Sequence, residues 1–247
     1  MSAPLFLVER LPTGPTHTLD GPEGHHAATV VRLRPGERLR LADGRGGVAD
    51  AVVEAVGRHQ LDLRVVDTGY VSATDPRLVV AQGVAKGDRG ELAVQAMTEV
   101  GVDEILPWAA ARSVTRWRDD RGARARRRWV DTAREATKQA RRPWLPTIGG
   151  SDQQPAEPTD AVAARCAASA ASFVLHESAQ QRLAVADLPT TGSVLLVVGP
   201  EGGIDDAELA TFVDAGARPV RLGPAVLRTS TAGVAALALL SGRLGRW

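Results

Sequence analysis

The chain contains a single cysteine, Cys166, among its 247 residues. One cysteine excludes an intramolecular disulfide and a zinc site built from several thiolates. Its alanine-rich surroundings favour a small filler of the hydrophobic core. The sequence also lacks a G-x-G-x-x-G segment after a strand and a G-x-x-x-x-G-K segment followed by Ser or Thr, so the two standard phosphate-binding loops are disfavoured. We therefore predict no metal site and no phosphate-loop chemistry.

Long hydrophobic runs are also missing. The longest, Ala232 to Leu240, covers about half of the roughly 20 residues needed to cross a bilayer. The N-terminus lacks the basic segment of a signal peptide, and the acidic Glu9 follows its first apolar residues. With 44% hydrophobic and 24% charged residues, the composition is that of an ordinary folded globule. We expect a cytoplasmic protein without a membrane span.

Lysine is scarce, since only Lys86 and Lys138 accompany 28 arginines, and the net charge is only +1. The charge is nevertheless uneven, because residues 116–142 hold eleven Arg or Lys against four Asp or Glu. This segment predicts a basic helix that ends at Pro143, and it indicates either a nucleic-acid partner, RNA or DNA, or a merely solvated helix face. The arginines expected to contact nucleic acid, two of them in the N-terminal domain, are Arg32, Arg34, Arg112, Arg116, Arg124, Arg126 and Arg127.

The N-terminal part consists of short alternating apolar stretches separated by glycine-containing turns. This pattern predicts a small β-rich unit. Its one expected helix contains His25 and Val31 and ends at Pro35-Gly36. A polar, turn-prone segment follows Tyr70, so we place a first domain at residues 1–72.

Residues 73–247 alternate expected strands and helices, which predicts a mostly parallel α/β sheet with helices on its faces. Two helix starts have capping-box spacing, Asp88 with Glu91 and Asp205 with Glu208. The expected strands are residues 77–84, 104–108, 173–175, 194–198 and 220–222.

Three loops follow strands in this second domain. Gly199-Pro-Glu-Gly-Gly203 lies between a buried strand and a capped helix, and residues 175–177 and 222–228 also follow strands. Ligands of open α/β sheets bind at the carboxyl ends of strands, so the three loops form one pocket if their strands are neighbours. The alternatives are an ordinary strand-to-helix turn for the glycines and a structural role, instead of a base, for His176.

A set of segments, in order along the second domain, carries a family resemblance. The segments are Lys86-Gly-Asp-Arg89, Met97 to Val102, Ala111 to Trp117, Glu135 to Arg142, Leu175-His-Glu177, Gly199 to Gly203 and Leu222 to Ala232. Together they resemble the RsmE family, the 16S ribosomal RNA (uracil(1498)-N(3))-methyltransferases of the SPOUT superfamily. The resemblance extends over nearly the whole chain, including His25 to Gly36 in the N-terminal part. The ordered set is specific, whereas Gly-Pro-Glu-Gly-Gly alone is shared by several SPOUT branches.

The resemblance implies a PUA-like RNA-binding β-barrel followed by a SPOUT α/β methyltransferase domain with a C-terminal trefoil knot. It further implies an S-adenosylmethionine cofactor, a homodimer and 16S rRNA of the small ribosomal subunit as substrate. Where the family usually has Arg-Thr-Glu-Thr-Ala, this chain has Ser230 as the third residue. The residues expected against the cofactor are Leu175, His176, Glu177, Gly199, Pro200, Gly202, Gly203, Leu222, Gly223 and Leu227.

Methylation of uracil N3 requires loss of the imide proton and stabilisation of negative charge on the carbonyl oxygens. Arg228 is the candidate for the second task, because its guanidinium is a fixed charged donor. Glu201 or Glu177 could accept the proton if a dry pocket raised its pKa, and the alternative for Glu201 is that it caps the following helix or holds the loop. A rival interpretation pairs Arg228 with one of these glutamates. The alternative functions are methylation of another base or of a ribose, and RNA binding without catalysis.

Overall fold

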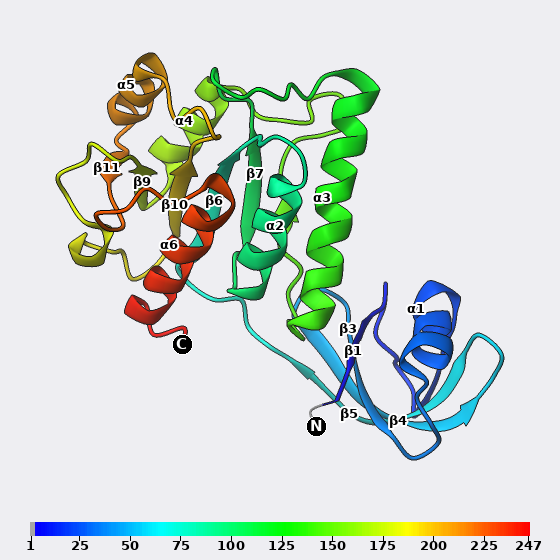
Figure 1. The fold of residues 1–247 in the computed structure, drawn as a ribbon. Helices are drawn as coiled ribbons and strands as arrows, with labels where there is room; N and C mark the ends of the chain where they lie inside the picture. Colours follow the sequence, from blue (N-terminus) through cyan, green and yellow to red (C-terminus); the bar gives the residue numbers. More distant parts are fainter. Residues whose placement is uncertain (1–2) are drawn as a thin grey trace. The chain divides into compact units, whose positions relative to one another are not determined.

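The computed structural model describes residues 3–247, which divide into two compact units (Figure 1). One unit contains the residues up to Ala73 together with Thr137–Leu145, and the other contains Thr74–Ala136 and Pro146–Trp247. The segment Thr137–Leu145 belongs to the first unit through backbone hydrogen bonds of Pro143 and Leu145 with Gly46 and Gly44, and through side-chain contacts. Trp144 donates its indole N–H to the Val71 carbonyl oxygen at 2.8 Å. Its ring lies so close to Gly46 that a Cβ there would be 2.7 Å from it.

The first unit is built on a five-stranded sheet in the order β1-β3-β4-β5-β2. The β1–β3 pair is parallel and the other three pairs are antiparallel. No ladder joins β1 to β2 among residues 3–247, so the sheet is an open half-barrel and not the closed barrel of the sequence prediction. The strands are β1 (Leu5–Leu7), β2 (Thr16–Leu19), β3 (Arg38–Ala42), β4 (Gly47–Val56) and β5 (Leu61–Tyr70).

Alternating burial in β4 places Ala49, Ala51 and Val53 in the core of this unit, as expected of a sheet with one solvated face. The expected helix forms as α1 (Gly21–His25) and continues as a π-helical turn, His26–Val31. The helix ends at Arg32, which adopts a left-handed conformation (φ 59°). It therefore ends before the proline and glycine that were predicted to stop it.

The second unit contains a six-stranded sheet in the order β11-β9-β10-β6-β7-β8, in which every pair is parallel. The predicted parallel α/β sheet is thus confirmed. The last strand lies two residues earlier than predicted. The strands are β6 (Arg77–Gly83), β7 (Glu104–Trp108), β8 (Thr147–Ile148), β9 (Ala171–Leu175), β10 (Ser193–Val198) and β11 (Arg218–Val220).

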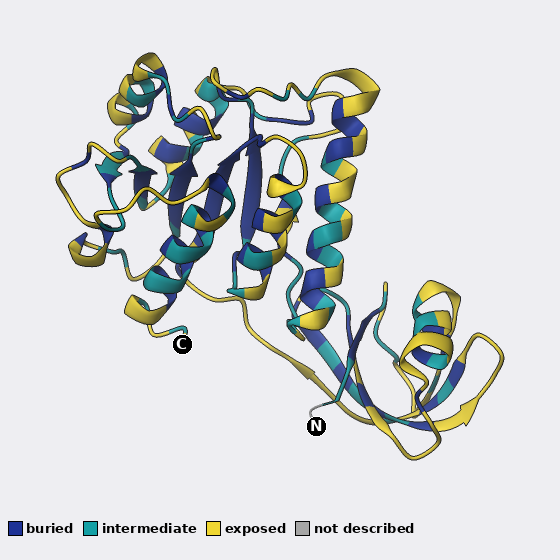
Figure 2. Ribbon diagram, in the orientation of Figure 1, coloured by how far each residue is buried: buried dark blue, intermediate teal, exposed yellow. Residues whose placement is uncertain are grey.

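Helices cover both faces of this sheet, so its central strands are buried on both sides (Figures 1 and 2). Leu78 and Val80 of β6 pack toward α2, α3 and α6, whereas Val79 and Ala81 pack toward α4 and α5. On α3, Trp129 forms the predicted narrow buried face with two alanines. The helices are α2 (Arg89–Glu99), α3 (Asp119–Gln139), α4 (Thr159–Ala168), α5 (Asp206–Asp214) and α6 (Thr229–Arg243).

The two capping-box predictions have different outcomes. At α5, Asp205 accepts from the Ala207 N–H and Glu208 bonds back to the Asp205 N–H, so that prediction is confirmed. At α2, Asp88 makes no side-chain capping bond with any residue of the described chain, and its backbone is already helical (φ −83°, ψ −1°). A helical backbone does not aim the side chain at the first N–H groups, so the second prediction is wrong.

No helix in residues 3–247 is long and apolar enough to cross a membrane.

Candidate active site

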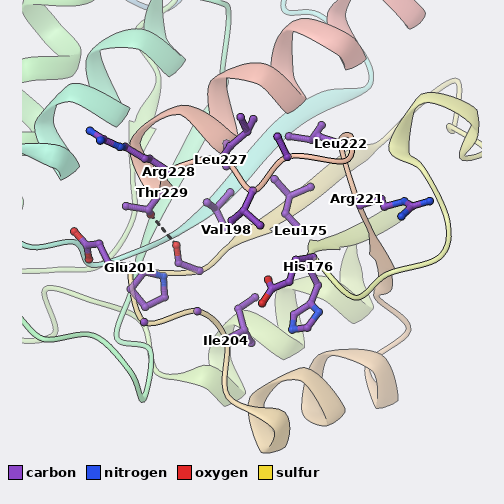
Figure 3. A pocket seen from close by; sticks show the side chains of 18 of the residues that line it. Leu175, His176, Val198, Glu201, Ile204, Arg221, Leu222, Leu227, Arg228 and Thr229 are labelled. Atoms are coloured by element: carbon purple, nitrogen blue, oxygen red, sulfur yellow. Dashed lines mark hydrogen bonds between the residues drawn. The ribbon is translucent and has the colours of Figure 1, made fainter.

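The three strand-end loops meet because their strands β9, β10 and β11 are neighbours and run in parallel. They enclose a cavity of about 690 Å³ at the carboxyl edge of the sheet (Figure 3). The structure therefore confirms the prediction that the three loops form one pocket. Every residue predicted to bind the cofactor or to act in catalysis lines it, namely Leu175, His176, Glu177, Gly199, Pro200, Glu201, Gly202, Gly203, Leu222, Gly223, Leu227 and Arg228.

The glycines of the loop at residues 199–203 are required by the protein's own packing. A Cβ on Gly202 would lie 2.9 Å from the Arg112 carbonyl oxygen, and one on Gly199 would lie 2.8 Å from Ile204 Cγ1. Gly203 has φ +73°, a conformation that other residues rarely adopt. The sequence interpretation gave close approach of a ligand as the reason for these glycines. The structure adds that the loop itself could not form with side chains there.

Arg228 ends the third loop and precedes α6. Its side chain is exposed and makes no hydrogen bond or ion pair with any residue the structure describes. Figure 3 shows it on the same side of the cavity as Glu201, with His176 and Arg221 on the other side. The rival interpretation, a pair between Arg228 and Glu201 or Glu177, is therefore not what this structure contains. The guanidinium is left available for a substrate.

Glu201 is held by a different arginine. Its carboxylate forms an ion pair of 2.9 Å with Arg89 and accepts a hydrogen bond of 3.1 Å from the Lys86 backbone N–H. Burial raises the pKa of Glu201, but the hydrogen bonds from Arg89 and from backbone N–H groups outweigh it and hold the pKa below its ordinary value. The raised pKa that the sequence analysis gave as the condition for a base is therefore not present at Glu201. Its proton-accepting role stays a prediction.

The pH dependence of the reaction tests whether Glu201 acts as a base with a raised pKa. Since the pKa of Glu201 lies below the ordinary 4.5, the carboxylate stays ionised at neutral pH, and the stability it adds is lost only as the pH falls through this lowered value. We expect wild-type protein and Glu201→Gln to share the same shape of single-turnover rate against pH between about 5.5 and 8.5. An acidic limb that is present in the wild type and absent in Glu201→Gln would identify Glu201 as a base with a raised pKa.

The loop after β9 favours the structural interpretation of His176. Its Nδ1 lies 2.8 Å from Ser178 Oγ and accepts from the Ser178 backbone N–H at 3.3 Å. Its backbone N–H donates to the Val220 carbonyl oxygen, which joins this loop to β11. Glu177 is exposed beside it.

Several wall residues were not predicted from the sequence. Thr229 is buried where α6 begins, and Arg221 belongs to the third loop's strand end. Part of the apolar wall comes from strand ends and from Ile204, which the sequence analysis did not assign to the site. Pro224, Ala225 and Val226 lie in the third predicted loop. The wall residues outside the three predicted loops include Val198, Ile204, Val220, Arg221, Thr229 and Ala232, with Arg89 and Asp206 at the cavity.

The arginines predicted to contact RNA have unequal surroundings. Arg126 is mostly buried and donates to the carbonyl oxygens of Ile148 and Gly149, which indicates a structural role. Arg116 likewise donates to two backbone carbonyls of its own loop. Arg124 is exposed and has no side-chain partner within the described chain.

The other predicted arginines keep exposed guanidinium groups. Arg127 pairs with Asp152 at 2.7 Å, and Arg112 lines the cavity 3.6 Å from Asp205. In the first unit, Arg34 is exposed, and Arg32 makes only a long hydrogen bond to the Thr29 carbonyl oxygen. In residues 3–247 we find no group of three or more His, Cys, Asp or Glu side chains arranged to hold a metal ion.

Comparison with known proteins identifies the family. A family model for an RNA methyltransferase domain matches residues 73–241, and one for an RNA methyltransferase PUA domain matches residues 19–66. The chain is 46% identical to ribosomal RNA small subunit methyltransferase E of Mycobacterium bovis, over 100% of this chain and 94% of that protein. Identity to the Bacillus subtilis protein of the same name is 30%, over 94% and 92% of the two chains.

A solved structure shows the same fold. It is a Legionella pneumophila protein, described as a methyltransferase in complex with the bound cofactor SAM, with 28% identity, a TM-score of 0.84 and 98% coverage of both chains. The matched domain extends over more than half of this sequence, and the resemblance drawn from the motifs is confirmed by relatives that align over nearly the whole chain. The chain belongs to the RNA methyltransferase family, among the ribosomal RNA small subunit methyltransferases E.

Proposed function

We propose that this chain methylates N3 of a uridine, at position 1498, in 16S ribosomal RNA of the small subunit, with S-adenosylmethionine as the methyl donor. Family membership supports RNA methyl transfer. At the site, the main support for the proposal is that three loops, which follow β9, β10 and β11, meet at one cavity. Arg228 lies at the edge of this cavity, and its side chain pairs with no residue of the described chain.

The cavity fits the cofactor in size and in chemistry. Its volume of about 690 Å³ lies within the roughly 300–1,000 Å³ of small-molecule sites. Val198, Ile204 and Leu222 supply apolar walls, and Gly223 leaves open space, since a Cβ there would meet no atom of residues 3–247 within 4 Å. When bound, S-adenosylmethionine supplies an activated methyl group on a sulfonium. The residues of the three loops would hold it at this edge of the sheet.

Arg228 has the chemistry to favour the transition state. Uracil that loses its N3 proton carries negative charge on its two carbonyl oxygens, and a guanidinium offers two parallel donors to such charge. In the ground state the same positive charge repels the sulfonium, so its contribution arises chiefly as charge develops on the base. Interactions that form only then raise turnover instead of binding.

The decisive experiment incubates the purified protein with labelled S-adenosylmethionine and small-subunit RNA or particles that lack the modification. Nuclease digestion followed by nucleoside mass spectrometry then identifies the product. We expect 3-methyluridine at one position. A methylated ribose or another methylated base would show the first alternative function, and binding of cofactor and RNA without any product would leave a non-catalytic RNA-binding protein. Ser230, half-buried on α6, is where this chain departs from the family pattern.

We further propose that residues 1–72 form an RNA-binding domain and residues 73–247 the methyltransferase domain. In the second unit, the exposed Arg112, Arg124 and Arg127 support contacts to RNA, and in the first unit the exposed Arg32 and Arg34 do so independently. A homodimer and a C-terminal trefoil knot complete the proposal. The knot is supported by Arg221, whose backbone bonds to Gln181 and Leu183 place this earlier loop beside the strand that leads into α6. Small-subunit RNA as substrate also implies action in the cytoplasm.

Replacing both Arg124 and Arg127 with alanine is expected to weaken RNA binding. Each lost phosphate contact should flatten the slope of log affinity against log salt by about one. Fluorescence anisotropy over a salt series measures this slope, and calorimetry with S-adenosylhomocysteine should show unchanged cofactor affinity. Arg126→Ala should instead lower the melting temperature, because two backbone carbonyls lose their donor. An unaltered slope in the double variant would make this face a solvated surface.

A further inference from the structure

A buried amide, Gln82, lies at the end of β6 beside the start of α6 and is fully inaccessible to solvent. Its Nε2 donates to Thr229 Oγ1 at 2.8 Å and to the Gly83 carbonyl oxygen at 3.2 Å. Thr229 Oγ1 in turn donates to the Gly199 carbonyl oxygen at 2.7 Å, the dashed line in Figure 3. This chain of hydrogen bonds joins three segments that are far apart in the sequence.

The direction of each bond follows from the chemistry of the groups. A hydroxyl has one proton, and the Gly199 carbonyl can only accept, so the Thr229 proton points to Gly199. Thr229 must then accept from Gln82, which fixes the NH2 side of the amide toward it. Within residues 3–247, Gln82 Oε1 is left without a hydrogen-bond donor. A buried oxygen without a donor lowers the stability of the fold. The presence of an amide here is therefore better explained by the segments that it joins than by a gain in stability from its packing.

The segments that meet here are those that form the active site. Gly199 begins the glycine-rich loop, and Thr229 directly follows Arg228. The end of β6 lies against the same loop, because a Cβ on Gly83 would be 2.6 Å from the Pro200 backbone nitrogen. Close packing of this kind transmits the position of one segment to the next.

We propose that the Gln82–Thr229–Gly199 hydrogen-bond chain is a positioning device, which fixes Arg228 relative to the loop that holds the methyl donor. The proposal rests on the proposed function and assigns Gln82 and Thr229 as positioning residues. Methyl transfer needs donor, base and guanidinium in one geometry, and a misplacement of about 1 Å can cost roughly 100-fold in rate. A buried and direction-fixed linkage is suited to prevent such a misplacement.

The first test compares variants of Thr229. Thr229→Val keeps the shape but removes both bonds, and its single-turnover rate at saturating cofactor and RNA should fall roughly 10- to 100-fold. Thr229→Ser keeps the hydroxyl and should restore most of the rate. Thr211→Val is the matched control, since the Thr211 hydroxyl likewise donates to a backbone carbonyl oxygen, that of Ala207 on α5, and Thr211 is not among the residues that line the cavity.

The second test separates positioning from a merely structural role. If Thr229 acts through Arg228, then Arg228→Ala should lower the single-turnover rate by a much smaller factor in the Thr229→Val variant than in the wild type. This non-additivity is what a double-mutant cycle measures. Gln82→Met, which removes the donor but fills the space, should repeat the coupling if Thr229→Val does not fold. Strictly additive losses, or full activity of Thr229→Val, would overturn the proposal. A wild-type protein that methylates no RNA would instead overturn the proposed function.

Discussion

Replacing Arg228 with alanine is expected to lower the single-turnover methylation rate by about 100-fold or more, the usual cost of removing one donor to a developing oxyanion. The variant should still fold and still bind S-adenosylhomocysteine and RNA. This expectation follows from the structure, because the Arg228 side chain is exposed and holds no other described residue in place. Its loss should therefore remove the proposed contact to substrate and leave the loops as they are.

Arg228→Lys separates charge from geometry. Lysine keeps the positive charge but loses the planar fork, so its rate should lie between those of the wild type and Arg228→Ala. Rapid-quench kinetics at saturating cofactor and RNA give the rate, while calorimetry and thermal unfolding give cofactor affinity and stability. Joint collapse of cofactor affinity and melting temperature in Arg228→Ala would assign Arg228 to holding the loops, and the catalytic role would be wrong.

The sequence was sufficient to predict the pocket and the order of the main elements of the second unit, although the two-residue edge strand β8 and the short helical turn Leu183–Val185 were not predicted. Apolar strands such as Val194 to Val198 are buried on both faces, and glycine-rich turns directly follow strands, so local pattern and topology carry the information. The Asp205–Glu208 capping box was predictable for the same reason, since its partners are three residues apart.

What the sequence could not predict depends on pairs that are distant along the chain. The ion pair of Glu201 with Arg89 spans 112 residues, and the bond of Gln82 to Thr229 spans 147. No local spacing encodes such partners, so the lowered pKa of Glu201 could not be predicted from the sequence. The sequence also could not predict that Thr137–Leu145 belongs to the first unit, because this depends on contacts of Trp144 with Gly46 and Val71, which are distant along the chain.

Gly202→Val is expected to weaken cofactor binding strongly while the rest of the protein stays folded. Gly202 is exposed, but a Cβ on it would already lie 2.9 Å from the Arg112 carbonyl oxygen and Cβ atom, and valine adds two methyl groups. The loop must move to relieve this contact. Overpacking of this kind costs about 1–3 kcal/mol, which corresponds to roughly 5- to 150-fold in affinity if the cost falls on the bound conformation.

Calorimetry with S-adenosylhomocysteine, together with thermal unfolding, measures this effect. Gly14→Val is the matched control, because a Cβ at Gly14 meets no atom of the described residues within 4 Å and Gly14 is in the first unit. The cofactor affinity of Gly202→Ala should lie between the affinities of Gly202→Val and Gly14→Val. Its single methyl group makes the close contact with Arg112 but lacks the two further methyl groups of valine. Wild-type affinity in Gly202→Val with an unchanged melting profile would mean that the cofactor binds away from the glycine-rich loop, and the proposed site would have to be abandoned.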